Sequence, residues 1–337
     1  MNRKFSPLYF ITLLLIASVI FLAVNLKLFW QEEKHTVTIA ISKTPLSTPF
    51  YVAESINAFE NSCVNVKFEH VIGGQKAFAK VMSGDVDFGT SSDSVIAFQS
   101  LNNHSFVSHA MFAQSDNDVK LITRKKDNIT SLASLHGKKI GVTRSTSSEY
   151  FLSILLAIDG LNIKNVNIIN YEPEKLINAL INKEVDAITP WEPFVFQSDQ
   201  LFSNEITIHE TKNLNTLSFN LISQTPDIEK LEEAKCILQG LNTAIEYIAS
   251  NPEQAKNLVV NELDLSTEFI NWVWPDYIFK LELNQSLLLN LQSQASWLAN
   301  SHLSLQIKLP DMNKFVDSRA MLYVSPNAVM FNNIENN

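Results

Sequence analysis

The sequence predicts an α/β protein with two similar lobes, each built around a mainly parallel sheet. Strand-like and helix-like segments alternate from Val37 to Ile188, which is the pattern of βα units. A short motif recurs within that alternation and indicates that the unit occurs twice. The length of 337 residues and the 46% hydrophobic content are enough for a large buried core.

The first unit alternates strands with helices between Val37 and Leu101. Runs of β-branched residues predict strands, and apolar residues at helical spacing predict helices. Gly73 and Gly74 predict a turn. The expected strands are Val37–Ile41, Val64–Phe68 and Val86–Gly89, and the expected helices are Phe50–Phe59, Gln75–Met82 and Ser94–Leu101.

The second unit follows the same order. Ser145 to Ser148 are expected to cap an apolar helix, and Pro173 opens another helix at a first turn that tolerates proline. From Ile228 onward the chain is predicted to be mainly helical. The expected strands are Lys138–Val142, Val166–Ile169 and Val185–Ile188, and the expected helices are Tyr150–Ile158 and Pro173–Asn182.

The recurring motif occurs first at Ser83–Thr90 and again at Asn182–Thr189. Each segment contains a helix end, a tight turn, an acid, a Val-Asp pair, a short apolar strand and a threonine. Ligands of open α/β sheets bind beyond the carboxyl ends of strands. Two such units therefore predict two lobes that face one cleft.

The bulk composition excludes several functions. The net charge of −9 argues against a nucleic-acid partner, because Lys and Arg supply most of the affinity for phosphates. Neither the cysteines nor the seven histidines have metal-ligand spacing, so no metal or cofactor is expected. In an oxidising compartment Cys63 and Cys236 could form a disulfide, and otherwise they are small buried apolar residues.

The N-terminus predicts a membrane segment. Arg3 and Lys4 precede an uncharged apolar run, Leu8–Leu26, which approaches the ~20 residues that span a bilayer. Positive residues before the run place the body outside the cytoplasm. Residues 1–30 are interpreted as an uncleaved signal anchor, and a cleaved signal peptide is the alternative.

Several segments in order resemble the sulfonate, nitrate, taurine and thiamine-precursor periplasmic binding proteins of ABC importers. The resemblance spans about residues 37 to 325. It rests on Ser47–Ala53, Gly73–Gly74, Ser83–Gly89, Leu135–Val142, Trp191–Pro193 and Met312–Asp317.

This resemblance implies the type II periplasmic-binding-protein fold. Lobe 1 would contain residues 37–120 and 220–330, and lobe 2 residues 121–219. A two-segment hinge would lie near Val119–Arg124 and Ser218–Ser223. The implied partners are a small-molecule ligand and an ABC permease. The sequence has no lipoprotein cysteine after the apolar run, which raises a membrane-attached sensor as an alternative.

The expected anion site is Ser145, Thr146 and Ser147, together with Arg144. A helix start carries unpaired N–H groups and a favourable dipole, and an arginine can bind an oxyanion through two hydrogen bonds. The interpretation without a ligand is that the hydroxyls only cap the helix and Arg144 points to water.

Lobe 1 is expected to contribute Thr90, Ser91 and Asp93, although an N-cap role suits Asp93 better. Other expected ligand contacts are Thr48, Tyr51, Gly74 and Trp191, with wall packing as the alternative for the aromatic residues. Glu192 is interpreted as a solvated or capping acid. Arg144 and the hydroxyls favour an anionic head group, whereas Asp93 and the aromatic residues equally suit a cationic or aromatic ligand.

These observations predict a binding protein rather than an enzyme. The sequence contains no G-x-S-x-G, P-loop or metal cluster. Fungal pyrimidine synthases of the resembled family are enzymes with this fold, but their Cys-rich motif is absent here.

Overall fold

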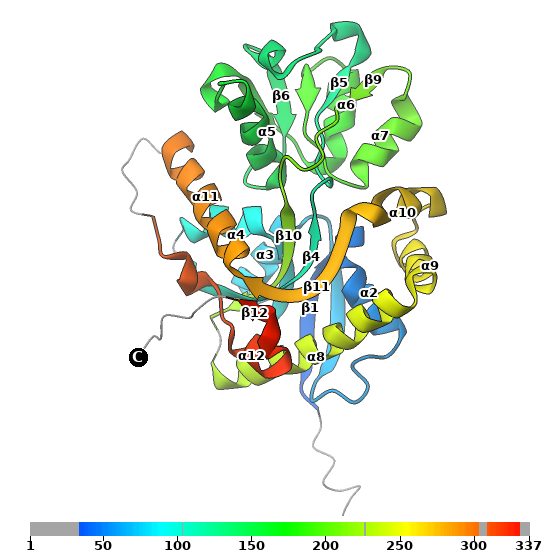
Figure 1. The fold of residues 1–337 in the computed structure, drawn as a ribbon, viewed down its shortest axis with the longest axis vertical. Helices are drawn as coiled ribbons and strands as arrows, with labels where there is room; N and C mark the ends of the chain where they lie inside the picture. Colours follow the sequence, from blue (N-terminus) through cyan, green and yellow to red (C-terminus); the bar gives the residue numbers. More distant parts are fainter. Residues whose placement is uncertain (1–33, 103, 226, 303–308, 331–337) are drawn as a thin grey trace, which may run out of the picture. The chain divides into compact units, whose positions relative to one another are not determined.

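The computed structural model describes residues 34–102, 104–225, 227–302 and 309–330. The chain divides into two units, Met1–His35 and Thr36–Asn337, and the described fold belongs to the second. The predicted membrane segment Leu8–Leu26 lies outside the described residues. Within the described ranges, no helix is long and apolar enough to cross a bilayer. The second unit contains two sheets (Figure 1), and we call the parts around them lobe 1 and lobe 2.

Lobe 1 is built on the larger sheet. Its strands are β1 (Thr36–Ser42), β2 (Asn65–Val71), β3 (Phe88–Ser92), β4 (Phe106–Ser115), β10 (Leu217–Gln224), β11 (Tyr277–Asn284) and β12 (Val329–Met330). They lie in the order β12-β11-β4-β10-β3-β1-β2. The helices are α2 (Thr48–Ser55), α3 (Gly74–Ser83), α4 (Asp93–Ser100), α8 (Ile228–Ser250), α9 (Pro252–Leu263), α10 (Thr267–Val273), α11 (Gln285–His302) and α12 (Arg319–Val324).

Lobe 2 is built on the smaller sheet. Its strands are β5 (Ile122–Arg124), β6 (Lys139–Val142), β7 (Asn167–Asn170), β8 (Ala187–Ile188) and β9 (Ile206–Ile208), in the order β7-β6-β8-β5-β9. Its helices are α5 (Ser147–Ile158), α6 (Leu176–Ile181) and α7 (Phe194–Phe202), and they flank this sheet in Figure 1.

Short 3-10 turns connect these elements. They are η1 (Pro45–Ser47), η2 (Lys125–Asp127), η3 (Leu132–Leu135), η4 (Ile163–Asn165), η5 (Pro173–Lys175), η6 (Trp274–Asp276), η7 (Met312–Phe315) and η8 (Pro326–Ala328).

Both sheets are mixed, so the prediction of mainly parallel sheets is wrong. The β1 strand pairs in parallel with β2 and β3, whereas β10 is antiparallel to β3 and β4. In lobe 2, β6 is parallel to β7 and β8, whereas β5 is antiparallel to β8 and β9. The chain leaves lobe 1 after β4 and returns as β10, and the returning strand inserts in the opposite direction.

The repeated motif is confirmed as the same local structure in both lobes. The strand that each motif contains, β3 or β8, pairs in parallel with the first strand of its repeated unit, β1 or β6. Asp87 accepts a hydrogen bond from the Thr38 N–H at 2.8 Å, and Asp186 accepts one from the Lys139 N–H at 2.9 Å. Gly84 and Lys183, at the tight turns, both have positive φ. Each aspartate thus connects the segment after its helix to the first strand of its repeated unit, β1 or β6.

Some element boundaries differ from the predictions. The α2 helix starts at Thr48 and ends at Ser55, because Asn57 adopts a left-handed conformation. The β3 strand runs to Ser92, so its hydroxyl residues belong to a buried strand. The β11 strand was not predicted, because its pairing with the distant β4 leaves no regular alternation of buried and exposed residues.

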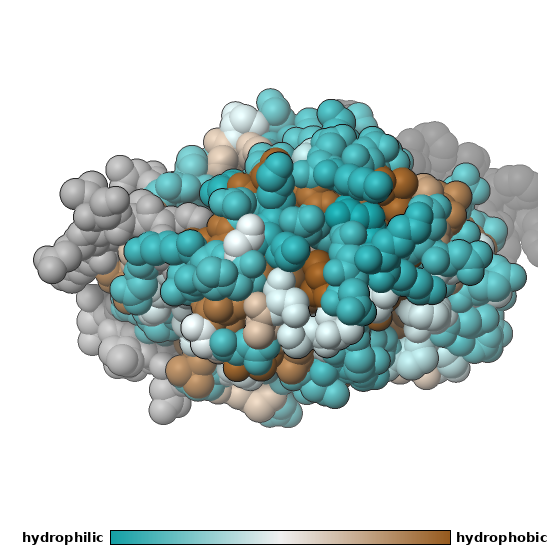
Figure 2. Space-filling model, turned by 90° about the horizontal axis from the view of Figure 1, so that it is seen from above, coloured by the Kyte–Doolittle hydropathy of each residue, from teal (hydrophilic) through white to brown (hydrophobic). Residues whose placement is uncertain are grey.

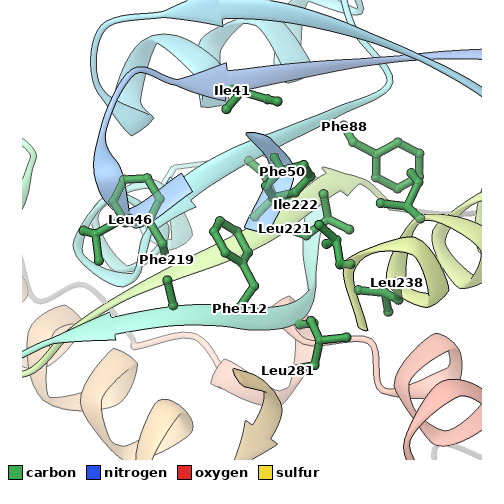
Figure 3. Close-up of a cluster of buried hydrophobic side chains, with 14 of the residues drawn as sticks. Ile41, Leu46, Phe50, Phe88, Phe112, Phe219, Leu221, Ile222, Leu238 and Leu281 are labelled. Carbon is green, nitrogen blue, oxygen red and sulfur yellow. The ribbon is translucent and has the colours of Figure 1, made fainter. Parts of the chain in front are cut away.

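The lobe 1 core lies between the sheet and its helices. Phe50 from α2 contacts Phe112 from β4 edge to face, with ring centroids 5.0 Å apart. Figure 3 shows both rings beside Phe219 and Leu46, so side chains from α2, β4, β10 and η1 share one cluster. Aromatic pairs of this geometry add to the stabilisation from buried area. The face of the molecule drawn in Figure 2 is mostly hydrophilic, with only separate hydrophobic patches.

Residues 116–121 and 209–216 connect the two sheets. The first segment is held to lobe 2, because Lys120 N donates to the Pro190 carbonyl and Glu192 N donates to the Asp118 carbonyl. The two segments lie several residues before the predicted crossings. The reason is that β5 already begins at Ile122 and β10 at Leu217.

Cys63 and Cys236 form a disulfide, with their Cα atoms 5.9 Å apart. Cys63 follows α2 and Cys236 lies on α8, so the bond joins parts of lobe 1 that are 173 residues apart in sequence. Disulfides persist mainly in oxidising compartments.

Candidate functional site

A cavity lies where lobe 1, lobe 2 and the first connecting segment meet. It encloses about 540 Å³ of empty space, including the part open to solvent. Residues that line it from lobe 1 include Ser42, Thr44, Gly73, Gly74, Gln75, Lys76, Ser92 and Phe219, and those from lobe 2 include Thr143, Thr146, Ser147, Glu172 and Trp191.

The N-terminus of α3 opens into this cavity. Gly73 precedes the helix with a φ of 83° and offers no side chain to cap it. Gly74 leaves little room for a side chain, because an added Cβ would lie 3.0 Å from the Ser91 Cα atom and 3.1 Å from the Ser92 nitrogen. Lys76 N donates to the Gly73 carbonyl at 3.2 Å, whereas the N–H groups of Gly74 and Gln75 lie at the start of the helix, where no carbonyl within the helix can accept them. This end of α3 therefore favours an anion.

Two further helix starts line the same cavity. Ser92 caps α4 by accepting the Val95 N–H, and Thr146 caps α5 by accepting the Ser148 N–H. The Ser147 side chain lines the cavity, and no described residue is hydrogen-bonded to its hydroxyl. The starts of three helices therefore surround one cavity. Their dipoles and the hydroxyl groups in the cavity wall both favour an anion there.

Charged side chains of both signs line the cavity. Lys76 on α3 forms an ion pair with Glu172 of lobe 2 at 3.2 Å, and both are about half exposed. Asp118 is buried, and its Oδ1 accepts a hydrogen bond from the Tyr277 hydroxyl at 2.8 Å. Burial raises the pKa of Asp118 to about 6, although Tyr277 and Lys120 favour its charged form.

Glu192 lies beside the cavity and is only 1% exposed. It accepts the Phe196 N–H of α7 and lies 3.8 Å from the ammonium group of Lys120. Burial raises the pKa of Glu192 to about 8. The positive charge of Lys120 opposes this shift, and the negative charge of Asp118 adds to it. Its interpretation as a capping acid is confirmed, and its interpretation as a solvated acid is wrong.

Among the predicted site residues, Gly74, Thr146, Ser147 and Trp191 line this cavity. Trp191 lies against Gly73, where an added Cβ would be 3.7 Å from its ring. These residues come from segments far apart in sequence, and the two lobes bring them together.

Thr90 and Ser91 lie behind the cavity wall. The Thr90 hydroxyl accepts the Ser42 N–H at 2.9 Å, and the Ser91 hydroxyl donates to the Gly74 carbonyl at 3.3 Å. Both predicted residues therefore form hydrogen bonds to residues that line the cavity, Ser42 and Gly74.

Thr48 and Tyr51 are buried in lobe 1 and do not line the cavity. The Thr48 hydroxyl donates to the Pro45 carbonyl. The Tyr51 ring stacks on His70 with centroids 5.8 Å apart. Their polar groups are thus used within the lobe.

Asp93 also lies outside the cavity, because it is turned into lobe 1. It accepts hydrogen bonds from the Ser94 N–H at 2.7 Å and from the Asn290 amide at 2.6 Å. Burial raises the pKa of Asp93 to about 7, although the hydrogen bond from the Ser94 N–H favours the charged form.

Arg144 and Ser145 line a different hollow, beside α4 and α11. Glu149, one turn into α5, pairs with the Arg144 guanidinium at 3.6 Å and accepts the Ser145 N–H at 2.9 Å. This ion pair keeps Arg144 on the side of α5 away from the cavity.

Several cavity residues escaped the sequence analysis. The repeat could have identified Ser42 and Thr143, because they lie at equivalent places where the first strand of each unit ends. The predicted helix start after Gly73 could have identified Lys76, because it places this residue in the first helical turn. Asp118 has no local signal, because it lies in a connecting segment without a recognisable motif.

Comparison with known proteins assigns the family. The profile described as NMT1/THI5 like matches residues 44–255. The chain belongs to the NMT1/THI5-like family. The matched part includes the second repeated unit, most of the first, and every residue named above as lining the cavity except Ser42.

The curated relatives of this family member are distant. The taurine-binding periplasmic protein of Escherichia coli is 25% identical over 182 residues, which cover 54% of this chain and 54% of that protein. A candidate binding protein of Brucella abortus is 26% identical over 155 residues, or 43% of this chain and 49% of that protein. The chain thus spans about half the length of the relatives it matches.

Solved structures share the fold over nearly their whole length. The alkanesulfonate-binding protein of Xanthomonas axonopodis, solved with bound MOPS, has a TM-score of 0.71 at 15% identity and covers 84% of this chain and 98% of its own. The aliphatic sulphonate-binding protein of Escherichia coli has a TM-score of 0.66 at 17% identity, with coverages of 83% and 99%. The predicted periplasmic-binding-protein fold is therefore confirmed.

Proposed function

We propose that this protein is the extracytoplasmic solute-binding protein of an ABC-type importer. We further propose that it binds a small organic oxyanion, such as a sulfonate, in the cavity between the lobes. One observation carries the proposal: the start of α3, which has no capping side chain, opens into that cavity beside Lys76. The names of the taurine- and sulfonate-binding relatives support this class of ligand.

The proposed contacts come from both lobes. The N–H groups of Gly74 and Gln75 and the Lys76 ammonium would bind the head group from lobe 1. Thr146 and the Ser147 hydroxyl would bind it from lobe 2, and Trp191 would pack on the apolar part of the ligand. A ligand that contacts both lobes binds their closed arrangement better than an open one, which is what a binding protein requires.

Calorimetric unfolding of the purified full chain against a panel of solutes tests the ligand class. The panel contains ethanesulfonate, 2-aminoethanesulfonate, nitrate, bicarbonate, thiamine and uncharged sugars. A ligand at 100 times its dissociation constant stabilises the native state by ~2.7 kcal/mol. Stabilisation by sulfonates supports the proposal. A response only to thiamine or to sugars would reject the oxyanion.

The variant Ser147→Ala tests the site. A hydrogen bond to a charged group contributes about 1.5–3 kcal/mol, so the affinity should fall at least about tenfold. Ser153→Ala is the matched control, since this hydroxyl lies on the same helix and donates to the Tyr150 carbonyl at 2.6 Å. Equal effects of the two substitutions would remove Ser147 from the site.

The apolar run Leu8–Leu26 motivates a membrane attachment. We propose that it is retained as an anchor, and a cleaved signal peptide would give the same extracytoplasmic location. The mass of the mature protein from membranes distinguishes the two.

Co-purification with permease subunits supports transport, whereas co-purification with a signalling protein supports the sensor alternative. Recovery of a chemically altered ligand would instead favour an enzyme.

A further inference from the structure

Asp118 differs from the other carboxyl group that lines the cavity. Among the described residues, Asp118 and Glu172 are the acids in its wall. Glu172 is more than half exposed and paired with Lys76, whereas Asp118 is only 4% exposed. A buried carboxylate is costly unless its oxygen atoms receive hydrogen bonds.

The known partners of Asp118 leave part of its carboxylate unused. The Tyr277 hydroxyl donates to Oδ1 at 2.8 Å. The Lys120 ammonium donates instead to the Asn117 carbonyl and lies 3.8 Å from Glu192. Within the described part of the chain no residue donates to Oδ2. A carboxylate can accept about four hydrogen bonds, so Asp118 can accept a donor that arrives in the cavity.

The polarity of the wall is therefore divided. The start of α3 and Lys76 favour an anionic group, whereas Asp118, in the connecting segment, favours a cation or a hydrogen-bond donor. A purely anionic ligand would leave this carboxylate desolvated beside a like charge. A ligand with charges of both signs would satisfy both parts of the wall.

We infer that Asp118 determines specificity by binding a primary ammonium group, and that the ligand is a short zwitterion with an oxyanion at its other end. This inference rests on the proposed oxyanion site and narrows its ligand class to compounds such as aminoalkanesulfonates. Tyr277 positions the carboxylate, and the connecting segment places it between the two lobes.

The test compares two ligands that differ only in the amino group. Isothermal titration of the full chain measures the affinities for 2-aminoethanesulfonate and ethanesulfonate. A charge-assisted hydrogen bond predicts a preference of about 10- to 100-fold for the amino compound. Equal affinities would overturn the inference and leave the proposed function intact. Binding of neither compound would reject the oxyanion site, and the inference would fall with it.

The variant Asp118→Asn assigns the preference to this residue. Asparagine still accepts the Tyr277 hydrogen bond, and circular dichroism checks its fold. We expect the preference to disappear while the affinity for ethanesulfonate is kept or rises. Asp116→Asn, in the same segment but outside the cavity wall, should retain the preference. A preference that survives Asp118→Asn would overturn the assignment to this residue. If the variant fails to fold, the comparison of the two ligands in the unsubstituted protein still tests the inference.

Discussion

Loss of the disulfide should destabilise lobe 1 strongly. The bond links Cys63 to Cys236 across 173 residues of chain. The loop-entropy relation gives about 5 kcal/mol for a loop of that length, and measured losses usually amount to about 2–5 kcal/mol. For Cys63→Ser/Cys236→Ser we therefore expect a fall of at least about 2 kcal/mol in the free energy of unfolding. Cys63 is exposed, so a reductant can reach the bond.

Denaturant unfolding with and without dithiothreitol measures this effect. Reductant should lower the midpoint of the unsubstituted protein and leave the double variant unchanged. Ser62→Ala, next to Cys63 on the exposed loop, is the control for a change at that surface. If alkylation finds two reactive thiols in the protein isolated without reductant, the bond is absent. If reduction breaks the bond without moving the midpoint, the loop-entropy reasoning is wrong.

Three further predictions follow from single contacts. Lys76→Ala should weaken sulfonate binding several-fold and reduce its dependence on salt, while Lys80→Ala, on the same helix but paired with Glu69, should leave titrations unchanged. The pKa of Glu192 is raised from 4.5 to about 8, so the native state holds its proton more tightly. The stabilisation from this proton is complete below about pH 4.5 and is lost as the pH rises through about 8. Unfolding at a series of pH values should show a decline that Glu192→Gln reduces. An unchanged decline would refute the role of Glu192. Asp186→Ala removes the acceptor of a strand N–H and should lower the free energy of unfolding by about 1–3 kcal/mol, and an unchanged thermal midpoint would contradict this.

The repeat could be predicted from sequence because its contacts are repeated as well. The Val-Asp pairs place Asp87 and Asp186 at equivalent points, where each binds a backbone N–H of the first strand. The helix cap at Thr146 was also predictable, since a capping hydroxyl and its N–H partner are two residues apart.

The lining of the cavity could be predicted only in part. Ser147 and Gly74 lie at helix starts that the sequence identifies. Arg144 does not reach the cavity, because Glu149 on the following turn pairs with it. Asp93 is likewise turned inward by Asn290, which is distant in sequence. The orientation of a charged side chain depends on partners that a local pattern does not contain.

The sequence by itself determined the α/β class, the two similar units and the helix starts that face their strand ends. These features depend on hydrogen bonds and apolar spacing within a few tens of residues. Only the tertiary structure decided the mixed pairing of the sheets, the bond between Cys63 and Cys236 and the place of Asp118 in the cavity wall. Each of these joins segments far apart in the chain, and such a contact depends on how the lobes fold and meet.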